Sequence, residues 1–141
     1  MSESTTMTRE QIQQLMDSSP LIRFLGLSCT HMDVGAGTLE LKMPKGSQLE
    51  RIESSGQFHG GAVAALIDTA GAFTVVMGTQ ATVPTINFRV DYLRPSTGGF
   101  LLAKALVRRV GKNIGVVDVD VFDEQARLTA VGRGCFGVAP A

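Results

Sequence analysis

The stretch Gly60–Gly78, GGAVAALIDTAGAFTVVMG, decides the fold of this chain. Asp68 is the only charged residue in its interior, which is otherwise apolar or small apart from two threonines. Apolar residues fall on every side of a helix drawn through the stretch, which is typical of a helix that is buried all round. Because the segment is at the lower limit for a membrane span and has a carboxylate at its middle, we expect a buried central helix instead.

Short segments with a period of two lie on both sides of this helix. Such alternation predicts antiparallel strands with one face in water, and we expect the four segments after the helix to form a meander. Before the helix, the turn at Gly35–Gly37 predicts a hairpin, and the polar loop Pro44–Phe58 is long enough for a functional loop. The predicted strands are Leu27–Val34, Thr38–Met43, Thr85–Arg94, Phe100–Arg109, Asn113–Asp123 and Leu128–Val138.

This order of elements predicts one α+β domain over residues 21–141, in which an antiparallel sheet wraps around a long central helix. Residues 1–20 are expected to form a tail and a short helix. Within them, Met1–Met7 has the composition of a tail. Thr8 can cap a helix that ends near Asp17, and Pro20–Leu25 is expected to form a second short turn.

Composition excludes several classes of function. The 141 residues include 13 basic and 13 acidic side chains, so no net charge favours nucleic acid or an anionic membrane surface as a partner. Cys29 and Cys135 lack metal-binding spacing and the chain has two histidines, so no metal site is expected. The polar N-terminus lacks the apolar core of a signal peptide, and with the lone cysteines this predicts a cytoplasmic protein with reduced thiols.

Asp68 is the candidate catalytic residue. A carboxylate inside an apolar helix is costly unless it is paired, hydrogen-bonded or protonated. Three uses are open: structural hydrogen bonds, an ion pair with a buried arginine such as Arg89, or catalysis. The tripeptide His59-Gly60-Gly61 favours catalysis, because free backbone amides at a helix N-terminus can form an oxyanion hole for acyl transfer.

The spacing of Gly60 and Asp68 predicts how such a site is assembled. Eight residues correspond to roughly 12 Å along a helix. One aspartate cannot easily act on a carbonyl whose oxygen lies at the N-terminus of its own helix. We therefore expect a two-fold homodimer in which Asp68 of one protomer and Gly60 of the other share each of two sites.

The run Gly56–Ala70, GQFHGGAVAALIDTA, resembles the signature of hotdog-fold acyl-CoA thioesterases of the phenylacetate-degradation type. Tyr92-Leu93-Arg94-Pro95 and Val110-Gly111-Lys112 are similar to that family's strand end and following turn. The resemblance covers nearly the whole chain from about Leu21. It implies a hotdog fold, a dimer and usually a homotetramer, and hydrolysis of acyl-CoA thioesters with no cofactor, since CoA is part of the substrate.

By position, the resemblance also implies roles for five residues. Asp68 activates water or attacks the thioester carbonyl, the Gly60 amide polarises that carbonyl, and His59 supports the loop or the thioester. Thr85 matches a hydroxyl position that orients the water, but alternation puts it on the polar face, so its aim at the site needs a bulge or strand end. Glu53 stands where the family often has Asn or Gln, and it cannot donate to an oxyanion unless protonated. Three explanations are open: Glu53 is a second acid or base, its side chain is rotated away from the site, or the match to the family is shifted by one residue here.

Coenzyme A carries phosphates, which call for basic side chains. Basic residues at strand ends are candidates for this role, although each is equally well explained as a solvated turn charge, and the turn backbone can hydrogen-bond the pantetheine arm. The predicted substrate-binding residues are Gly61, Arg94, Pro95, Arg108, Arg109, Val110, Gly111, Lys112 and Asn113. The acyl group is left open between a small aryl and a medium-length aliphatic chain.

Two other functions remain as alternatives. One is a hotdog hydratase or dehydratase acting on 3-hydroxyacyl thioesters, whose motif with proline near the histidine is missing here. The other is a non-catalytic acyl-CoA binding module, in which Asp68 would have no purpose.

Overall fold

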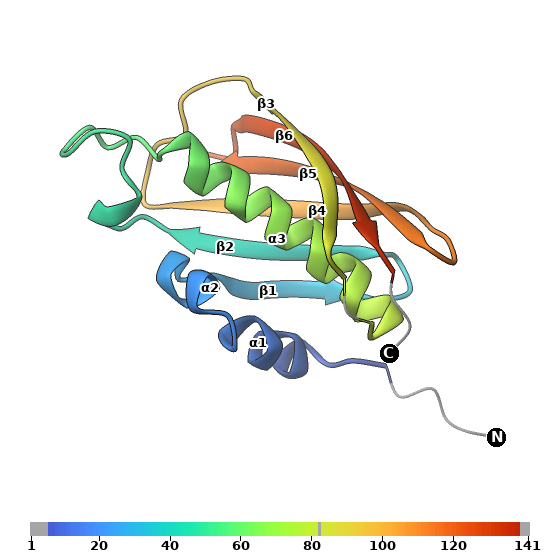
Figure 1. Cartoon of the computed structure of the whole chain (residues 1–141). Coiled ribbons are helices and arrows are strands. Elements are labelled where there is room, and N and C mark those ends of the chain that lie inside the picture. The colour runs from blue at the N-terminus through green and yellow to red at the C-terminus, as the bar shows by residue number, and fades with distance from the viewer. Residues whose placement is uncertain (1–5, 82, 139–141) are drawn as a thin grey trace.

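The computed structural model describes residues 6–81 and 83–138 (Figure 1). The predicted α+β class is confirmed, and each predicted helix and strand is present with ends that shift by a residue or two. The helices are α1 (Arg9–Asp17), α2 (Pro20–Leu25) and α3 (Gly60–Thr79), with a 3-10 turn, η1 (Ser47–Leu49), before α3. The strands are β1 (Ser28–Asp33), β2 (Thr38–Pro44), β3 (Thr85–Tyr92), β4 (Phe100–Val110), β5 (Ile114–Asp123) and β6 (Leu128–Gly137).

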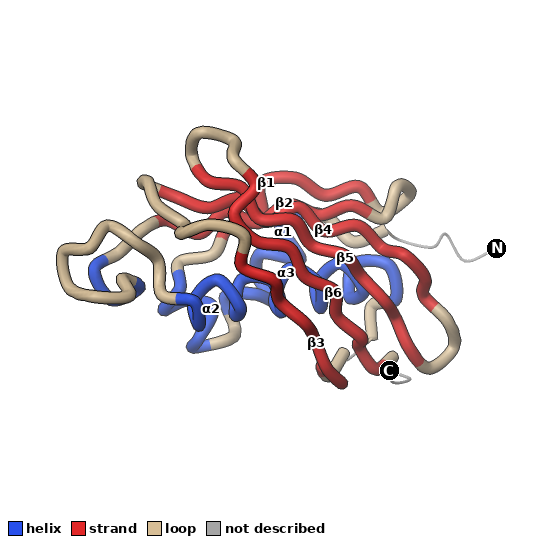
Figure 2. Tube along the Cα trace, turned by 90° about the horizontal axis from the view of Figure 1, so that it is seen from above, coloured by secondary structure: helices blue, strands red, loops and turns tan. Residues whose placement is uncertain are grey.

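The six strands form one antiparallel sheet in the order β1-β2-β4-β5-β6-β3. Figures 1 and 2 show α3 lying along one face of this sheet. The predicted four-strand meander is wrong, because β3 pairs with β6 at the sheet edge and only β4, β5 and β6 form a meander. Alternation shows which residues of a strand share a face. It does not show which strand is the neighbour, and consecutive strands are often not adjacent.

Small residues on the inner face of the sheet let α3 approach closely. A side-chain carbon at Gly132 would lie 2.7 Å from Cγ2 of Ile67, and one at Gly115 would lie 2.9 Å from Cγ2 of Val75. Both distances are shorter than carbon atoms tolerate, so glycine is required at these two contacts. The close packing fixes the position of α3, and with it the position of Asp68, relative to the sheet.

One side of α3 is buried, so the prediction of a helix buried all round is wrong for a single chain. The sheet-facing residues Leu66, Ala70 and Val75 are 0% exposed. The opposite side is only half-buried and consists of Ala64, Ala65, Asp68, Thr69, Ala72, Phe73 and Val76. By length and composition α3 also qualifies as a membrane span, but its buried side packs on the sheet as the core helix of a folded domain does.

The N-terminal helix α1 is docked onto the domain. Its predicted cap is confirmed: the Thr8 hydroxyl oxygen accepts from the Gln11 amide, and the Gln11 side chain accepts from the Thr8 amide. Ile12 and Met16 are 0% exposed and belong to the main hydrophobic core. The predicted tail, Met1–Met7, lies largely outside the described residues.

Candidate active site

Asp68 lies in the middle of α3, on its half-buried side. Its Oδ1 accepts a hydrogen bond of 2.7 Å from the Thr85 hydroxyl. Among residues 6–81 and 83–138, Oδ2 has no hydrogen-bond partner and no basic side chain pairs with this carboxylate. The alternative of an ion pair with Arg89 is wrong, because Arg89 pairs with Asp91 at 3.1 Å. Asp68 is thus a carboxylate held by one hydroxyl, with a second oxygen available to react.

Thr85 reaches Asp68 from the first position of β3. The pairing of β3 with β6 shifts register between Thr85 and Asn87, as a β-bulge does. Because strand alternation put Thr85 on the polar face, the predicted role of its hydroxyl depended on a bulge or a strand end at this position. The structure contains both, so the Thr85 hydroxyl is directed at α3.

The N-terminus of α3 leaves one backbone amide free. His59 is the N-cap, and its Nδ1 accepts from the Gly61 amide at 2.8 Å. The amides of Ala62 and Val63 donate to the His59 carbonyl. In the part of the chain that the structure describes, the Gly60 amide has no acceptor. Gly60 can therefore donate to a ligand, whereas the Gly61 amide is used by the cap.

A cleft of about 550 Å³ opens at this end of α3. The predicted residues Gly60, Arg94 and Pro95 line it, together with Arg51 and Gln57. The cleft therefore combines a free amide with two guanidinium groups, which suits an anionic or carbonyl-bearing ligand. The Asp68 carboxylate is not part of its lining, which agrees with the eight-residue separation along α3.

Tyr92 fixes the first turn of α3. Its hydroxyl donates to the Gly60 carbonyl at 2.6 Å, and its ring lies 3.4–3.5 Å from the place a side-chain carbon on Gly60 would take. Burial raises the pKa of the Tyr92 hydroxyl, so it stays protonated and able to donate. The sequence pointed to this contact only indirectly, through the alternation that puts Tyr92 on the same face as Phe88 and Val90.

The loop before α3 adds Arg51 and Gln57, which were not predicted as site residues, although Gln57 lies within the signature Gly56–Ala70. Arg51 Nε donates to Gln57 Oε1 at 3.1 Å, and the Arg51 amide donates to the Gln57 carbonyl at 2.8 Å. Gln57 also forms an isolated antiparallel bridge with Thr97. The signals in the sequence were the length of the loop and, for Gln57, its place in the signature. Neither predicts side-chain directions, since irregular backbone has no period.

Glu53 is not brought to the cleft. It is exposed in the turn of residues 52–55, beside Ser54, whose φ is +62°. It does not line the cleft around Gly60. Of the explanations open at this position, the placement agrees with a side chain that is rotated away.

The remaining predicted substrate-binding residues lie at the other end of the sheet, near the C-terminal end of α3 (Figure 1). Arg108 Nε is 3.5 Å from Asp118 Oδ2 on the outer face. The turn backbone is also engaged, since the Gly111 amide donates to Ile114 and the Asn113 carbonyl accepts from Val138. Within one chain, Gly60 is not joined by Arg108, Arg109, Val110, Gly111, Lys112 or Asn113.

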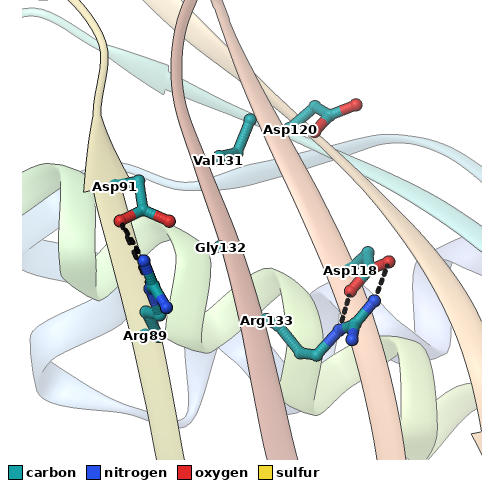
Figure 3. Close-up of a pocket in the computed structure, with 7 residues that line it drawn as sticks. All are labelled: Arg89, Asp91, Asp118, Asp120, Val131, Gly132 and Arg133. Carbon is teal, nitrogen blue, oxygen red and sulfur yellow. Dashed lines mark hydrogen bonds and ion pairs between the residues drawn. The ribbon is translucent and has the colours of Figure 1, made fainter.

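The outer face of the sheet holds a second cleft, of about 370 Å³, whose arginines are all paired. Figure 3 shows Arg133 making two parallel bonds to Asp118, of 2.6 and 2.9 Å, while Arg89 bonds Asp91. The hydrogen bond from Arg133 lowers the pKa of Asp118. These pairs neutralise one another on an exposed surface, so this face has the character of a structural ion-pair network.

The described residues contain no group of three or more His, Cys, Asp or Glu side chains that could hold a metal ion. Both cysteines are free thiols. Cys29 is buried, and burial raises its pKa, which disfavours the nucleophilic thiolate. The candidate groups are therefore the Asp68 carboxylate with Thr85 in the middle of α3, and the free Gly60 amide in a separate cleft at its N-terminus.

Known proteins resemble this chain over most of its length. A model of the thioesterase superfamily matches residues 55–130, more than half of the chain. A Halobacterium salinarum protein with a provisional esterase name is 38% identical over 138 residues, which cover 90% of this chain and 89% of its own. The acyl-coenzyme A thioesterase PaaI of Escherichia coli is 28% identical, over 85% of this chain and 83% of its own. The crystal structure of a thioesterase from Haemophilus influenzae matches with a TM-score of 0.84 at 27% identity, over 99% of this chain and 95% of its own.

Proposed function

This chain belongs to the thioesterase superfamily and has its hotdog fold, and we propose that it hydrolyses an acyl-CoA thioester to a free acid and CoA. The observation that carries the proposal is the Asp68 carboxylate, which is held by one hydroxyl on the open side of α3 and has one unpaired oxygen among the described residues. The acyl group proposed is a small aryl or a medium-length chain. The reaction consumes only water.

Two chemical routes use the free oxygen of Asp68. In the first, it takes a proton from a water whose oxygen forms the new bond to the thioester carbon. In the second, it attacks that carbon itself and forms an anhydride that water then opens. In both, the carbon–sulfur bond breaks and CoA leaves as the thiolate. Oxygen-18 water in a single turnover tests the second route, because label in the Asp68 carboxylate requires an anhydride that water opens at the Asp68 carbon and therefore excludes simple base catalysis.

The Gly60 amide supports the proposal by offering a hydrogen bond to the thioester carbonyl oxygen. Negative charge develops on that oxygen during the reaction, and the N-terminus of a 20-residue helix favours negative charge. The hydroxyl of Tyr92 and the cap formed by His59 hold this turn rigid. A rigid donor needs little reorganisation as the charge appears.

Asp68 and Gly60 of one chain do not share a cleft, and three features support a site shared by two protomers. The helix separates the two residues by roughly 12 Å. Among residues 6–81 and 83–138, no strand pairs with the outer edge of β3, and Ile86 and Phe88 on this strand are 54% and 38% exposed. The adjacent side of α3 is apolar and half-exposed. A second copy placed across this edge by a two-fold axis would cover these surfaces.

In such a dimer the two α3 helices run in opposite directions, so Asp68 of one protomer approaches Gly60 of the other. The turn at residues 110–113 of one protomer then approaches the Gly60 cleft of its partner, where Arg94 lies. Basic residues of both protomers, Arg94 and Lys112 among them, would then be available to the CoA phosphates. Pairing of two such dimers into a homotetramer stays a prediction.

The proposal is tested by following thiol release from a panel of aryl- and aliphatic acyl-CoAs. We expect the wild type to hydrolyse at least one of them. We expect Asp68→Asn and Asp68→Ala to lower kcat by about 10³-fold, close to 4 kcal/mol of barrier. Asp120→Asn is the matched control, because Asp120 is exposed on the outer face. Unchanged release in both Asp68 variants removes this residue from the mechanism, and no release from any acyl-CoA refutes the activity.

A further inference from the structure

The proposed site has one obvious donor to the thioester oxygen, the Gly60 amide. Oxyanion holes usually combine two or more donors, because the charge on a tetrahedral intermediate exceeds what one hydrogen bond stabilises. The resemblance assigns an amide side chain to the position of Glu53, which cannot donate when ionised. Glu53 is also exposed and lies outside the cleft. A second donor must therefore come from another residue.

Gln57 lines the same cleft as Gly60 and has the required group. Its Oε1 accepts from Arg51 Nε at 3.1 Å. Arginine can only donate hydrogen bonds, so the carboxamide must present its oxygen to Arg51 and its NH₂ to the other side. Within residues 6–81 and 83–138, that NH₂ has no hydrogen-bond partner. Gln57 thus has two N–H groups available to a ligand in the cleft.

The backbone around Gln57 is fixed on both sides. The Gln57 carbonyl accepts from the Arg51 amide at 2.8 Å, and the bridge to Thr97 holds this segment beside the loop between β3 and β4. One residue later, the Phe58 amide donates to Ser96 at 2.9 Å. With both backbone and side-chain oxygen anchored, the NH₂ of Gln57 is positioned before any ligand arrives, which is what an effective oxyanion donor requires.

We infer that Gln57 Nε2 donates the second hydrogen bond to the thioester carbonyl oxygen, beside the Gly60 amide. Arg51 is then a positioning residue that orients the carboxamide and adds positive potential at the cleft wall. The inference rests on the proposed thioesterase activity, because it assigns a donor within that same site. It makes Gln57, and not position 53, the source of the side-chain amide in this chain.

The test measures kcat and KM of purified variants with the best acyl-CoA of the panel. Gln57→Leu removes the donor and is expected to lower kcat by about 30- to 100-fold, with KM changed less than about 3-fold. Gln57→Glu keeps the oxygen facing Arg51 and should lose activity to a similar extent. Arg51→Ala should lower kcat about 10-fold, and Arg51→Lys should recover part of it because lysine also donates to Oε1. Gln48→Leu, at an exposed glutamine of η1, is the matched control and should leave kcat unchanged.

The outcomes separate this inference from the activity on which it rests. If Asp68→Asn abolishes thiol release while Gln57→Leu and Gln57→Glu keep wild-type kcat, Gln57 is not a donor and the thioesterase proposal stands. A rise in kcat on Glu53→Gln would also overturn the inference, by showing that position 53 reaches the oxygen. Absence of hydrolysis by the wild type would overturn both. Should Gln57→Leu fail to fold by circular dichroism, the near-isosteric Gln57→Glu decides the question.

Discussion

Asp68 on α3 and Asp123 at the end of β5 are both at least partly buried carboxylates, but they differ in how many hydrogen bonds they accept from the protein. The Asp123 side chain is 1% exposed and accepts from the amides of Gln125 and Arg127, at 3.0 and 2.9 Å, and from Arg127 Nε at 2.8 Å. Asp68 is half-buried and accepts one hydrogen bond, from Thr85. Three donors, one of them the Arg127 guanidinium, stabilise the charge of Asp123, whereas Asp68 keeps an oxygen without a partner in the described chain.

This difference separates a carboxylate that stabilises the fold from one that is available for chemistry. Donors from the turn occupy three acceptor sites of Asp123 and its side chain is 1% exposed, so this carboxylate closes a turn and is not accessible to a substrate. A partly bonded carboxylate on an open helix face contributes little to stability, and the proposed mechanism gives it a role in catalysis. The comparison therefore predicts that stability and activity respond to different aspartates.

The largest expected effect on stability is at Asp123. Asp123→Ala removes the acceptor of three hydrogen bonds, one of them charged, and is expected to lower the free energy of unfolding by about 2–3 kcal/mol. Urea denaturation measures this. Asp68→Ala, the matched variant, should lower it by less than about 1 kcal/mol. The contrast is refuted if the two variants lose equal stability, or if Asp123→Ala abolishes thiol release in protein that remains folded.

The dependence of the free energy of unfolding on pH provides a second test of Asp123→Ala. Burial alone would raise the pKa of Asp123, but the hydrogen bonds from Arg127 and Gln125 and the charge of Arg127 outweigh it and lower the pKa. The stabilisation is complete above the unfolded pKa of about 3.9 and is lost as pH falls through it towards the folded pKa. Asp123→Ala should lack this part of the acid sensitivity.

A smaller effect is expected at Thr85, on activity. Thr85→Val keeps the shape of the side chain and removes the hydroxyl that orients Asp68, so kcat should fall about 10-fold, or about 1.4 kcal/mol of barrier. Thr85→Ser keeps the hydroxyl and should retain most of the activity. The melting temperatures of both should stay close to that of the wild type, because Thr85 is exposed. A valine variant as fast as the wild type would show that the 2.7 Å bond to Asp68 has no catalytic part.

The sequence predicted the elements of the fold well and their arrangement only in part. The apolar run predicted α3, and alternation predicted all six strands to within two residues, because both signals are local. The place of β3 beside β6 depends on long-range pairing, which alternation does not encode. The open side of α3 was also beyond reach, since an apolar helix surface looks the same whether a sheet or a second chain covers it.

For the site, the sequence indicated those residues whose unusual place can be recognised from the helix sequence alone. Asp68 and Gly60 stand out because one is a charge in an apolar run and the other opens a helix. Gln57 did not, because its direction depends on its bond to Arg51 within an irregular loop. The basic residues of the turn at 108–112 were grouped with Arg94 by charge alone, although the fold puts them at the far end of the same chain.

Sharing of the site between two chains can be tested with a variant that removes a single backbone amide. Gly60→Pro deletes the free N–H at the first position of α3, where proline is well tolerated in helices. His59 has φ −61° and ψ 136°, the extended backbone that a residue before proline adopts. Gly60→Ala keeps the amide and controls for the added carbon. Alone, Gly60→Pro and Asp68→Asn should each be nearly inactive.

The decisive measurement is thiol release by a purified heterodimer of one Gly60→Pro chain and one Asp68→Asn chain, isolated through two different tags. If each site combines Asp68 of one chain with Gly60 of the other, one of the two sites is intact and about half of the wild-type activity per dimer returns. If the heterodimer is as inactive as its two parents, Asp68 and Gly60 act within the same chain and the shared site is wrong.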